Sequence, residues 1–495
     1  MKKALIVSNQ GLSTLHLGIE LEVIEKIASD FDEVVYTTCD SATLSCYFNP
    51  TGNPVGCAIC QARNIKFHQL LPIKNLKHVP FPKEQIDELA REIINNNKVP
   101  IENWSVNGVN IGRGILSSVI SLKRDYNVYD ENVKPLINEE LNVALKAIKG
   151  FEKLCNLVEP DEVFLFNGRF SETYPIVSYC KFHGKSFNTL EVGSTTQKFE
   201  MYKNQLPHSI KARKDNMWTL WKNAPDSKYK TADKWFTDKI QGLHKEDKNY
   251  TENQQKSLLP DNFNRNKINI SIFNSSEDEM KAIEEWQHDI YSTQNEAIRT
   301  IVEHFLPDQK IHFYLRMHPN LANLNNTQVN DALNLQYNNL TIIPSSDPID
   351  TYALIDNSDI IISFGSTVGI EATYKNKISI MLGKSFYSDM NAVFEPKSFD
   401  EVYNLIDSFY NLVPKPKENT LPYAYYVSNR GEDFKHLKYE NKYNSYYRNV
   451  KMNRFYILTL LNSFIYFFNI RHFIQKFLKL YGRWPMPWDL KKLKY

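Results

Sequence analysis

Short apolar runs separated by segments of helical periodicity dominate the first part of the chain. Residues 4–8 form one such run, apolar positions within 15–28 recur at helical spacing, and residues 33–39 form a second run. Two further runs, 161–170 and 185–194, flank another helical pattern. Because parallel strands need a crossover helix between them, this order predicts a parallel sheet.

A second alternating series begins near residue 267. Its predicted strands are 267–276, 311–320, 340–346, 359–365 and 377–383. Its longest helical pattern runs from 277 to 305. Two such series predict an α/β protein with two Rossmann-like domains facing a cleft, in which ligands bind at the carboxyl ends of the strands.

A chain of 495 residues is too long for one ordinary core, and its composition indicates where it divides. Residues 226–267 are polar and lack a clear period, which favours a connection between domains. We predict an N-terminal Rossmann-like domain over 1–225, the connection over 226–267, a second Rossmann-like domain over 268–450 and a tail over 451–495.

The tail differs from the rest in charge and aromatic content. Residues 451–495 hold nine Lys and Arg and one acid, interleaved with the aromatic run 455–470. That run is too short and too polar to span a bilayer. It predicts a basic amphipathic helix that either lies on an anionic membrane surface or packs on the body of the protein, and the pattern favours neither.

The overall charge argues against nucleic acid as a partner. There are 59 Lys and Arg against 57 Asp and Glu, a net charge of +2. The first 13 residues contain too few consecutive apolar positions for the core of a signal peptide, so we expect a cytoplasmic protein.

Residues with ligand-binding chemistry gather at predicted strand ends. YLRMHPN ends one strand with His318 and a proline, and Arg316 adds a permanent cation. Ser366 and Thr367 end another strand and begin a helix, where hydroxyls and backbone N–H groups bind anions. Glu371, one turn on, is placed to accept hydrogen bonds from a ribose diol. These residues predict a nucleotide site.

A third strand end, FNSSEDEM, carries hydroxyls and acids. Ser275 or Ser276 is placed to cap the following helix, with Asp278 or Glu279 completing a capping box. We expect this structural role first, and contact between Ser275 and a ligand second.

These segments together resemble a known family. FNSSEDE, RMHPN, DTYALIDNSDIIISFGSTVGIEA and the earlier FNGRF are similar to segments of bacterial capsule polysaccharide biosynthesis proteins, glycosyltransferases of the GT-B fold related to capsular Kdo transferases. The resemblance covers most of residues 160–390 and the N-terminal β-α-β unit. It implies a metal-independent transfer of sugar from a nucleotide sugar, such as a CMP- or UDP-sugar, to a glycan or glycolipid acceptor of a surface polysaccharide.

The resemblance also implies which residues hold the donor. Four positions match, His318, Ser366, Thr367 and Glu371, and we add Arg316, Asn320 and Ser275 from the same strand ends. The acceptor is expected over the N-terminal domain. The enzyme is then expected at the inner face of the cell membrane, held there by its tail.

The N-terminal domain offers candidates for the acceptor site. Asn167 and Arg169 follow a strong apolar strand, and Arg169 suits a carboxylate or phosphate. Glu191 ends the next strand and is our first candidate for the base that takes the acceptor proton. It is equally well interpreted as a partner of Arg169 or as a structural acid, and His208 is the competing base.

Four of the six cysteines are close in sequence, at spacing C-x6-C-x10-C-x2-C: Cys39, Cys46, Cys57 and Cys60. Such a set is compatible with a structural zinc site or an iron–sulfur cluster. Four ordinary buried thiols explain it slightly better, because only one pair has the spacing typical of a metal site.

Three other functions fit the same features. A polyol-phosphate transferase of the teichoic-acid type also has a His-Pro and a Ser-rich strand end, and an epimerase also binds a nucleotide sugar. A non-catalytic scaffold that retains a nucleotide-binding fold is the alternative outside the enzymes.

Overall fold

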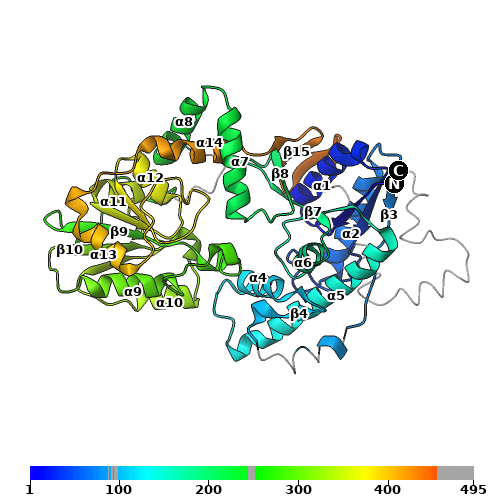
Figure 1. The fold of residues 1–495 in the computed structure, drawn as a ribbon, viewed down its shortest axis with the longest axis horizontal. Coiled ribbons are helices and arrows are strands. Elements are labelled where there is room, and N and C mark those ends of the chain that lie inside the picture. The colour runs from blue at the N-terminus through cyan, green and yellow to red at the C-terminus, as the bar shows by residue number, and fades with distance from the viewer. Residues whose placement is uncertain (87, 91–92, 94–98, 244–250, 454–495) are drawn as a thin grey trace, which may run out of the picture. The chain divides into compact units, whose positions relative to one another are not determined.

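The computed structural model describes residues 1–86, 88–90, 93, 99–243 and 251–453. The chain forms two compact units (Figure 1). The first comprises Met1–Ser118, Pro135–Pro207 and the described part of Gly431–Tyr495, and the second comprises Val119–Lys134 and His208–Arg430. Each unit surrounds its own sheet, mainly parallel in the first and wholly parallel in the second, so the predicted fold class, α/β with two Rossmann-like units, is confirmed.

The sheet of the first unit has seven strands in the order β14-β8-β7-β6-β1-β2-β3. Their bounds are β1 Lys3–Ser8, β2 Glu33–Thr38, β3 Leu76–His78, β6 Glu162–Phe166, β7 Ser186–Val192, β8 Lys198–Lys203 and β14 Glu432–Asp433. The strands from β7 to β3 are parallel, whereas β8 pairs antiparallel with β7 on one side and with β14 on the other. The parallel strands, numbered in chain order, lie as 3-2-1-4-5, which matches five strands of the Rossmann order 3-2-1-4-5-6.

Helices connect the parallel strands of this sheet. They are α1 Thr14–Ile27, α2 Pro54–Gln69, α4 Gly112–Lys123, α5 Lys134–Val158 and α6 Tyr174–Phe182. The hydroxyl of Ser13 caps α1, and the side chain of Asn53, followed by a proline at the first turn, caps α2. A short hairpin, β4 Ser105–Val106 and β5 Val109–Asn110, precedes α4.

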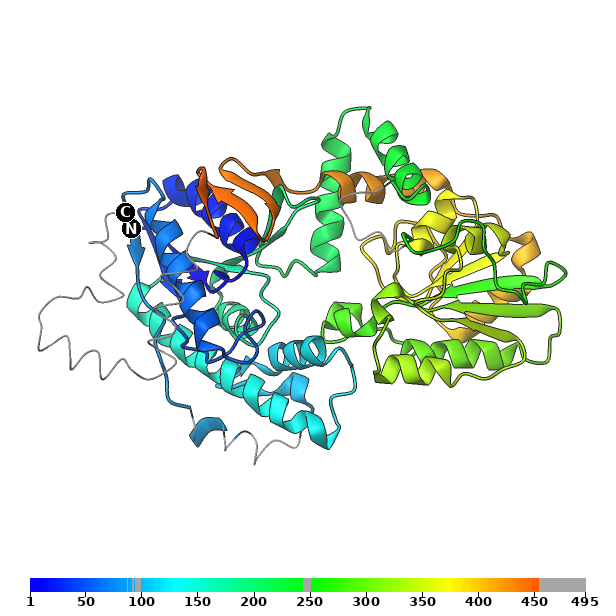
Figure 2. The same ribbon diagram turned by 180° about the vertical axis from the view of Figure 1, so that it is seen from behind.

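A small antiparallel sheet near the C-terminus packs on α1 (Figures 1 and 2). It consists of β15 Leu437–Asn441, β16 Asn444–Tyr447 and β17 Val450–Lys451. The buried carboxylate of Glu22 on α1 accepts hydrogen bonds from the backbone N–H groups of Lys435, His436 and Leu437 at 2.6 to 3.1 Å. These bonds fix residues after 430 to the first unit, although the sequence analysis assigned them up to 450 to the second domain.

The second unit has a purely parallel five-stranded sheet in the order β11-β10-β9-β12-β13. Its strands are β9 Ile268–Phe273, β10 Ile311–Arg316, β11 Leu340–Ile343, β12 Ile360–Ser363 and β13 Ile378–Met381. Numbered in chain order, the strands again lie as 3-2-1-4-5. Successive strands are added on one side of β9 up to β11 and on its other side from β12 onward, so the switch point lies between β9 and β12. The crevice above such a switch point is where open α/β sheets bind ligands.

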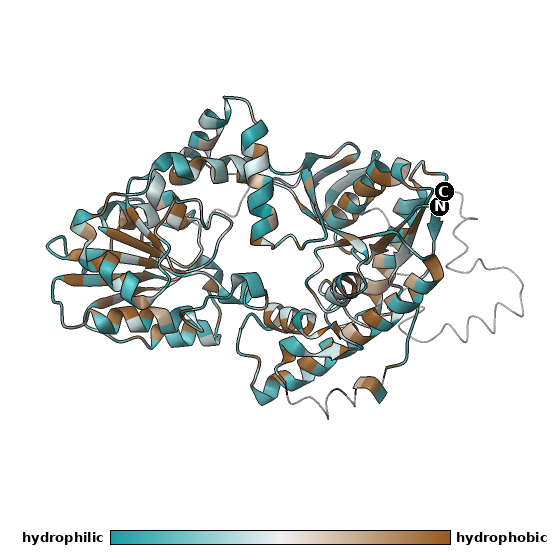
Figure 3. Cartoon of the chain, in the orientation of Figure 1, coloured by the Kyte–Doolittle hydropathy of each residue, from teal (hydrophilic) through white to brown (hydrophobic). Residues whose placement is uncertain are grey.

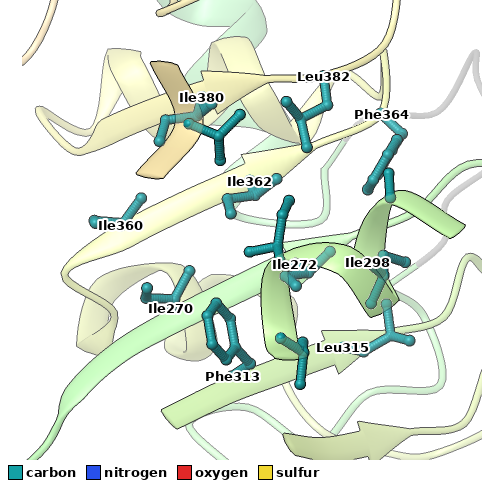
Figure 4. Packing of buried hydrophobic residues seen from close by; sticks show 14 of the residues in the cluster. Ile270, Ile272, Ile298, Phe313, Leu315, Ile360, Ile362, Phe364, Ile380 and Leu382 are labelled. Atoms are coloured by element: carbon teal, nitrogen blue, oxygen red, sulfur yellow. The ribbon is translucent and has the colours of Figure 1, made fainter. Parts of the chain in front are cut away.

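Both faces of this sheet are covered, and its strands are strongly apolar (Figure 3). Ile270, Ile272, Phe313, Leu315 and Ile362 point to one face, which is packed by α9 Gln294–His304, α10 Thr327–Leu333 and α13 Phe399–Asp407 (Figure 4). The alternate strand residues meet α11 Thr351–Asn357 and α12 Val368–Tyr374 on the other face. A parallel sheet buried on both sides needs such continuous apolar strands.

The predicted long helix over 277–305 is wrong in its first half. The α-helix begins only at Gln294, where the hydroxyl of Thr293 accepts a hydrogen bond from the N–H of Glu296. Residues 277–293 instead contain two single 3₁₀ turns, at Glu277–Glu279 and Glu284–Trp286. Glu277 and Asp278 are buried in this loop, so their tertiary contacts override the helical pattern.

The predicted connection over 226–267 also differs. It contains α8 Lys228–Ile240, whose Trp235 and Phe236 are buried in a cluster with α7 Ile210–Asn223 and α14 Leu421–Asn429. The longer segment of the second unit thus runs from His208, and part of the predicted linker belongs to its core.

Among the residues that the structure describes, no helix is long and apolar enough to cross a membrane. Residues 454–495, which carry nearly all of the predicted basic tail, lie outside that part, so the amphipathic helix stays a prediction.

Replacing Glu22 with alanine should destabilise the first unit by about 2–4 kcal/mol, because three backbone N–H groups, of which that of Leu437 is buried, lose a charged acceptor. Urea denaturation measures this loss, and limited proteolysis should cut sooner after residue 430. Glu432→Ala is the matched control, since its ion pair with Lys26 is exposed and should contribute less than about 1 kcal/mol. Equal stabilities of the two variants would contradict the anchoring role of Glu22.

Candidate functional site

A large cavity lies at the carboxyl ends of the strands in the second unit. Its volume is about 1040 Å³, and all of the residues that line it belong to this unit. Most of the lining comes from the segments that follow β9, β10, β12 and β13 and from the start of α11. The cavity therefore occupies the crevice that the strand order predicts.

The turn after β12 brings Ser366 and Thr367 into the lining. Gly365, just before them, has φ of +83°, and a Cβ there would overlap the carbonyl oxygen of Lys384. A Cβ at Gly369 would similarly overlap the hydroxyl of Ser363. Only glycine lets the loops after β12 and β13 approach this closely, and the approach places the two hydroxyls at the cavity.

His318 also lines the cavity, at the end of β10. Its backbone N–H donates to Asn274 Oδ1 at 2.7 Å, and its Nδ1 accepts a hydrogen bond from the N–H of Asn320 at 3.1 Å. Because Nδ1 is an acceptor, the neutral imidazole carries its proton on Nε2. His318 thus has the tautomer of a hydrogen-bond donor at Nε2.

Glu371 on α12 is buried and lines the same cavity. Its Oε2 accepts a hydrogen bond from the hydroxyl of Tyr352 at 2.7 Å. Burial and the neighbouring Glu371 carboxylate raise the pKa of Tyr352, so the phenol stays protonated and keeps donating. The tyrosine orients the carboxylate from α11.

The structure gives Arg316 a role that the sequence analysis did not predict. Its side chain is buried and reaches the lining, but Nη1 donates to the carbonyl of Pro344 at 2.7 Å and Nη2 to that of Asp347 at 2.9 Å. These bonds hold the turn after β11. Two of its nitrogens thus bind backbone carbonyls, whereas Nε has no hydrogen-bond partner among the described residues, and the expected contact with phosphate stays a prediction.

Ser275 and Asn320 also differ from expectation. Ser275 lines the cavity, and instead of capping a helix its hydroxyl accepts a hydrogen bond from Gln294 Nε2 at 2.7 Å. Asn320 is not part of the lining. Its side chain donates to Glu279 Oε1 at 2.7 Å, and its N–H holds His318. Asn320 thus lies behind His318.

Sequence reasoning missed the part of the lining that comes from residues 277–293, because it assigned them to a helix. This loop contributes aromatic rings. Trp286 meets Phe386 edge to face at 5.0 Å between ring centroids, and His288 stacks on Tyr291 at 4.7 Å. Burial lowers the pKa of His288 to about 4, so this ring is neutral at pH 7. The acids of FNSSEDEM, at the end of a predicted strand, were the one feature of the sequence that indicated a polar loop here.

Glu277 is the second missed feature of this loop. It is buried in the lining, its Oε1 accepts the N–H of Gln294 at 3.2 Å, and its Oε2 has no hydrogen-bond partner among the described residues. Burial raises the pKa of Glu277 to about 7, against the opposing effects of Lys281 and the Gln294 N–H. This carboxyl therefore titrates near neutral pH.

The candidate acceptor residues lie in the first unit. Glu191 Oε2 accepts a hydrogen bond from Asn167 Nδ2 at 2.9 Å, and its Oε1 accepts the N–H of Val192 at 3.0 Å. Arg169 lies over the ring of Phe170, 4.6 Å from its centroid. The side chain that the structure shows bonded to Glu191 is thus Asn167. His208 belongs to the second unit, where its carbonyl accepts the Trp286 indole N–H at 2.8 Å.

The four clustered cysteines line one small cavity of about 30 Å³ in the first unit. Burial raises the pKa of Cys39, Cys46 and Cys60, and Cys57 Sγ accepts a hydrogen bond from Asn49 Nδ2 at 3.2 Å. Within the described ranges, no three His, Cys, Asp or Glu side chains are grouped to hold a metal ion. The four thiols thus share one cavity, and the choice between a metal site and ordinary thiols stays a prediction.

No protein-family model and no curated protein matches this chain. Solved structures similar to it include the β-Kdo 2,7-transferase KpsC of Thermosulfurimonas dismutans, with 12% identity over 56% of this chain and 80% of that chain and a TM-score of 0.33. Capsular Kdo transferases, to which the sequence motifs point, are thus among its structural neighbours.

Two further neighbours carry nucleotide ligands. The UDP-GlcNAc 2-epimerase of Neisseria meningitidis, bound to UDP-GlcNAc, has 12% identity over 86% of this chain and 97% of that chain, with a TM-score of 0.26. The Streptomyces sp. SF2575 glycosyltransferase SsfS6, complexed with thymidine diphosphate, has 8% identity over 86% and 95%, with a TM-score of 0.23. At TM-scores this low, the likeness carries no functional argument of its own.

The raised pKa of Glu277 should make stability fall as pH rises. Below its ordinary value of 4.5 the carboxyl is protonated in both states, and between there and about 7 only the unfolded chain ionises. We expect a loss of about 3 kcal/mol across this window, measured by urea denaturation, and Glu277→Gln should lack this contribution. The remaining slope belongs partly to Glu172, whose pKa burial also raises to about 7.

Glu296→Gln is the control for this experiment, because Glu296 lines the same cavity but is exposed and accepts the N–H of Ser292 at 3.0 Å. It should keep the wild-type slope. Identical slopes in wild type and Glu277→Gln would contradict a buried, protonated Glu277.

The clustered thiols should react slowly in the folded protein. With a pKa of about 12, Cys60 is a thiolate in about one molecule in ten thousand at pH 8, and only the thiolate attacks a disulfide reagent. We expect native labelling by DTNB to be far slower than labelling in urea, where all six cysteines should react. Fast native labelling of Cys60, located by peptide mapping, would contradict this assignment.

Proposed function

We propose that the chain is a glycosyltransferase of the GT-B type, which takes a nucleotide-sugar donor into the cavity of the second unit. The observation that carries the proposal is the convergence of His318, the Ser366-Thr367 turn and Glu371 on one cavity at the switch point of a parallel sheet. Each side chain alone has an ordinary structural explanation. Together they match the parts of a nucleotide.

The phosphates are proposed to lie between His318 and the turn after β12. His318 supplies an Nε2–H donor, and Ser366 and Thr367 supply hydroxyls, all from loops that the fold already holds in place. Such preorganised donors stabilise the negative charge that grows on the leaving phosphate as the glycosidic bond breaks. In this proposal they do so without a metal ion, as the family resemblance implies.

The ribose is proposed to bind at Glu371. A carboxylate oriented by Tyr352 accepts hydrogen bonds from the two hydroxyls of a ribose, as acidic residues do in other nucleotide-binding α/β folds. The aromatic rings of the 277–293 loop supply apolar surface on which the base and the sugar of a CMP- or UDP-sugar are proposed to pack.

The acceptor is proposed to be a growing surface polysaccharide or its lipid-linked form, bound by the first unit. Asn167 and Arg169 are the candidates to hold it, and Glu191, held by Asn167, remains our first candidate for the base, with His208 as the competitor. Attachment to the inner face of the cell membrane through the tail is part of the proposal.

Replacing His318 with alanine should remove nucleotide binding and transfer while leaving the fold intact. A thermal-shift screen with CMP-, UDP- and GDP-sugars measures binding, since a ligand at 100 times its Kd stabilises by about 2.7 kcal/mol. We expect one nucleotide class to stabilise wild type and the exposed-histidine control His183→Ala, but not His318→Ala. Wild-type turnover by His318→Ala would overturn the assigned donor site.

The products of the same reactions separate the alternatives. A glycosidic linkage supports the proposal, whereas a phosphodiester linkage would identify a polyol-phosphate transferase and an altered sugar on the same nucleotide an epimerase. Binding without any turnover would favour the scaffold.

A further inference from the structure

A short segment that leaves the first unit and returns to it docks beside the donor cavity. Residues 119–134, here called the strap, belong to the second unit, while the chain before and after them belongs to the first. Arg124 on the strap has φ of +56°, a conformation uncommon outside glycine. Such backbone strain persists only where surrounding contacts hold it.

Both the side chain and the backbone of Arg124 are engaged. Its Nε forms an ion pair with Asp278, and its Nη2 donates to the carbonyl of Asn320 at 3.3 Å. Its own carbonyl accepts a hydrogen bond from Asn326 Nδ2 at 2.6 Å. The next residue, Asp125, accepts the N–H of Thr327 at 3.1 Å. One arginine thus joins the loop after β9 to the loop after β10.

Two hydrogen bonds through Asn320 link Arg124 to His318, the side chain proposed to bind the donor phosphate. Asn320 accepts from Arg124 through its carbonyl and donates through its N–H to Nδ1 of His318. The bond at Nδ1 decides which nitrogen of His318 carries the proton. The hydrogen bond from Arg124 to the Asn320 carbonyl therefore helps to fix the position of the N–H that sets the His318 tautomer.

The ion pair between Arg124 and Asp278 holds the loop after β9. Asp278 is buried, with 4% of its side chain exposed, and also accepts a hydrogen bond from the hydroxyl of Ser276. Its neighbours Glu277 and Glu279 line the cavity. Without Arg124 the buried Asp278 carboxylate loses this cation, so the loop has to rearrange to reach water.

We propose that Arg124 is a positioning residue for the donor site, which holds the two loops so that His318 keeps Nδ1 on the Asn320 N–H and turns Nε2–H toward the donor phosphate. The proposal rests on the proposed function. Arg124 is not among the residues that line the cavity, so it acts through Asn320 and Asp278 and not by touching the ligand.

The first test compares Arg124→Ala with wild type in donor binding and transfer. Calorimetry should show the Kd for the nucleotide sugar rising by about tenfold or more, because the loops lose their fixed geometry. Arg124→Lys should recover part of the affinity, since an ammonium reaches Asp278 but lacks the fork that also reaches Asn320. Hydrogen exchange should quicken in residues 275–281 and 318–321.

Two variants serve as matched controls. Lys123→Ala removes a neighbouring cation whose contacts, Asn127, Asp125 and Asp130, all lie in the strap, and it should leave the Kd unchanged. Lys134→Ala removes an exposed cation whose ion pair with Glu131 also lies within the strap, so its Kd should equal that of wild type.

The tautomer of His318 gives a readout that general destabilisation does not move. In ¹⁵N-histidine spectra of wild type, His318, assigned through His318→Ala, should be protonated at Nε2, and in Arg124→Ala it should become a mixture. An unchanged Kd and an unchanged tautomer in Arg124→Ala would overturn the positioning role alone. Failure of wild type to bind any nucleotide sugar would overturn the proposed function and this inference with it.

Discussion

The burial of both faces of the second sheet is the constraint on which the site depends. Strands such as Ile360–Ser363 and Ile311–Arg316 pack helices on either side, so the residues along their length are mostly apolar. Polar chemistry can then emerge only where the strands end. The 3-2-1-4-5 order separates the connections of β9 and β12, and the cavity lies in the space between them.

The cavity is formed by loops, and a set of buried polar contacts holds those loops in place. Arg316 holds the turn after β11, Gln294 holds Ser275, and Tyr352 holds the Glu371 carboxylate. None of these contacts requires a ligand. A site built in this way is preorganised, because its donors and acceptors are oriented before anything binds.

Several parts of this site could be predicted from the sequence. The strand ends carrying His318, Ser366 and Glu371 stood out because short apolar runs followed by polar turns have few other interpretations. The carbonyl partners of Arg316 could not be predicted, because a permanent cation at a strand end fits a phosphate and a pair of backbone carbonyls equally well. Which of the two it meets depends on the turn at 344–347, a neighbour only in space.

The backbone of the loop 277–293 could not be predicted either, because it too depends on residues that are distant in sequence. Its apolar spacing predicts a helix, yet Glu277 and Asp278 find partners in Gln294 and in Arg124, which is more than 150 residues away in sequence. Residues 431–453 likewise continue the second domain in sequence but belong to the first unit, because Glu22 binds their backbone. By itself the sequence determined the alternation of strands and helices and the residue types at strand ends, since local periodicity and turn chemistry encode both. Only the tertiary structure decided the partners of each polar group, because buried hydrogen bonds and ion pairs join segments whose distance along the chain carries no signal.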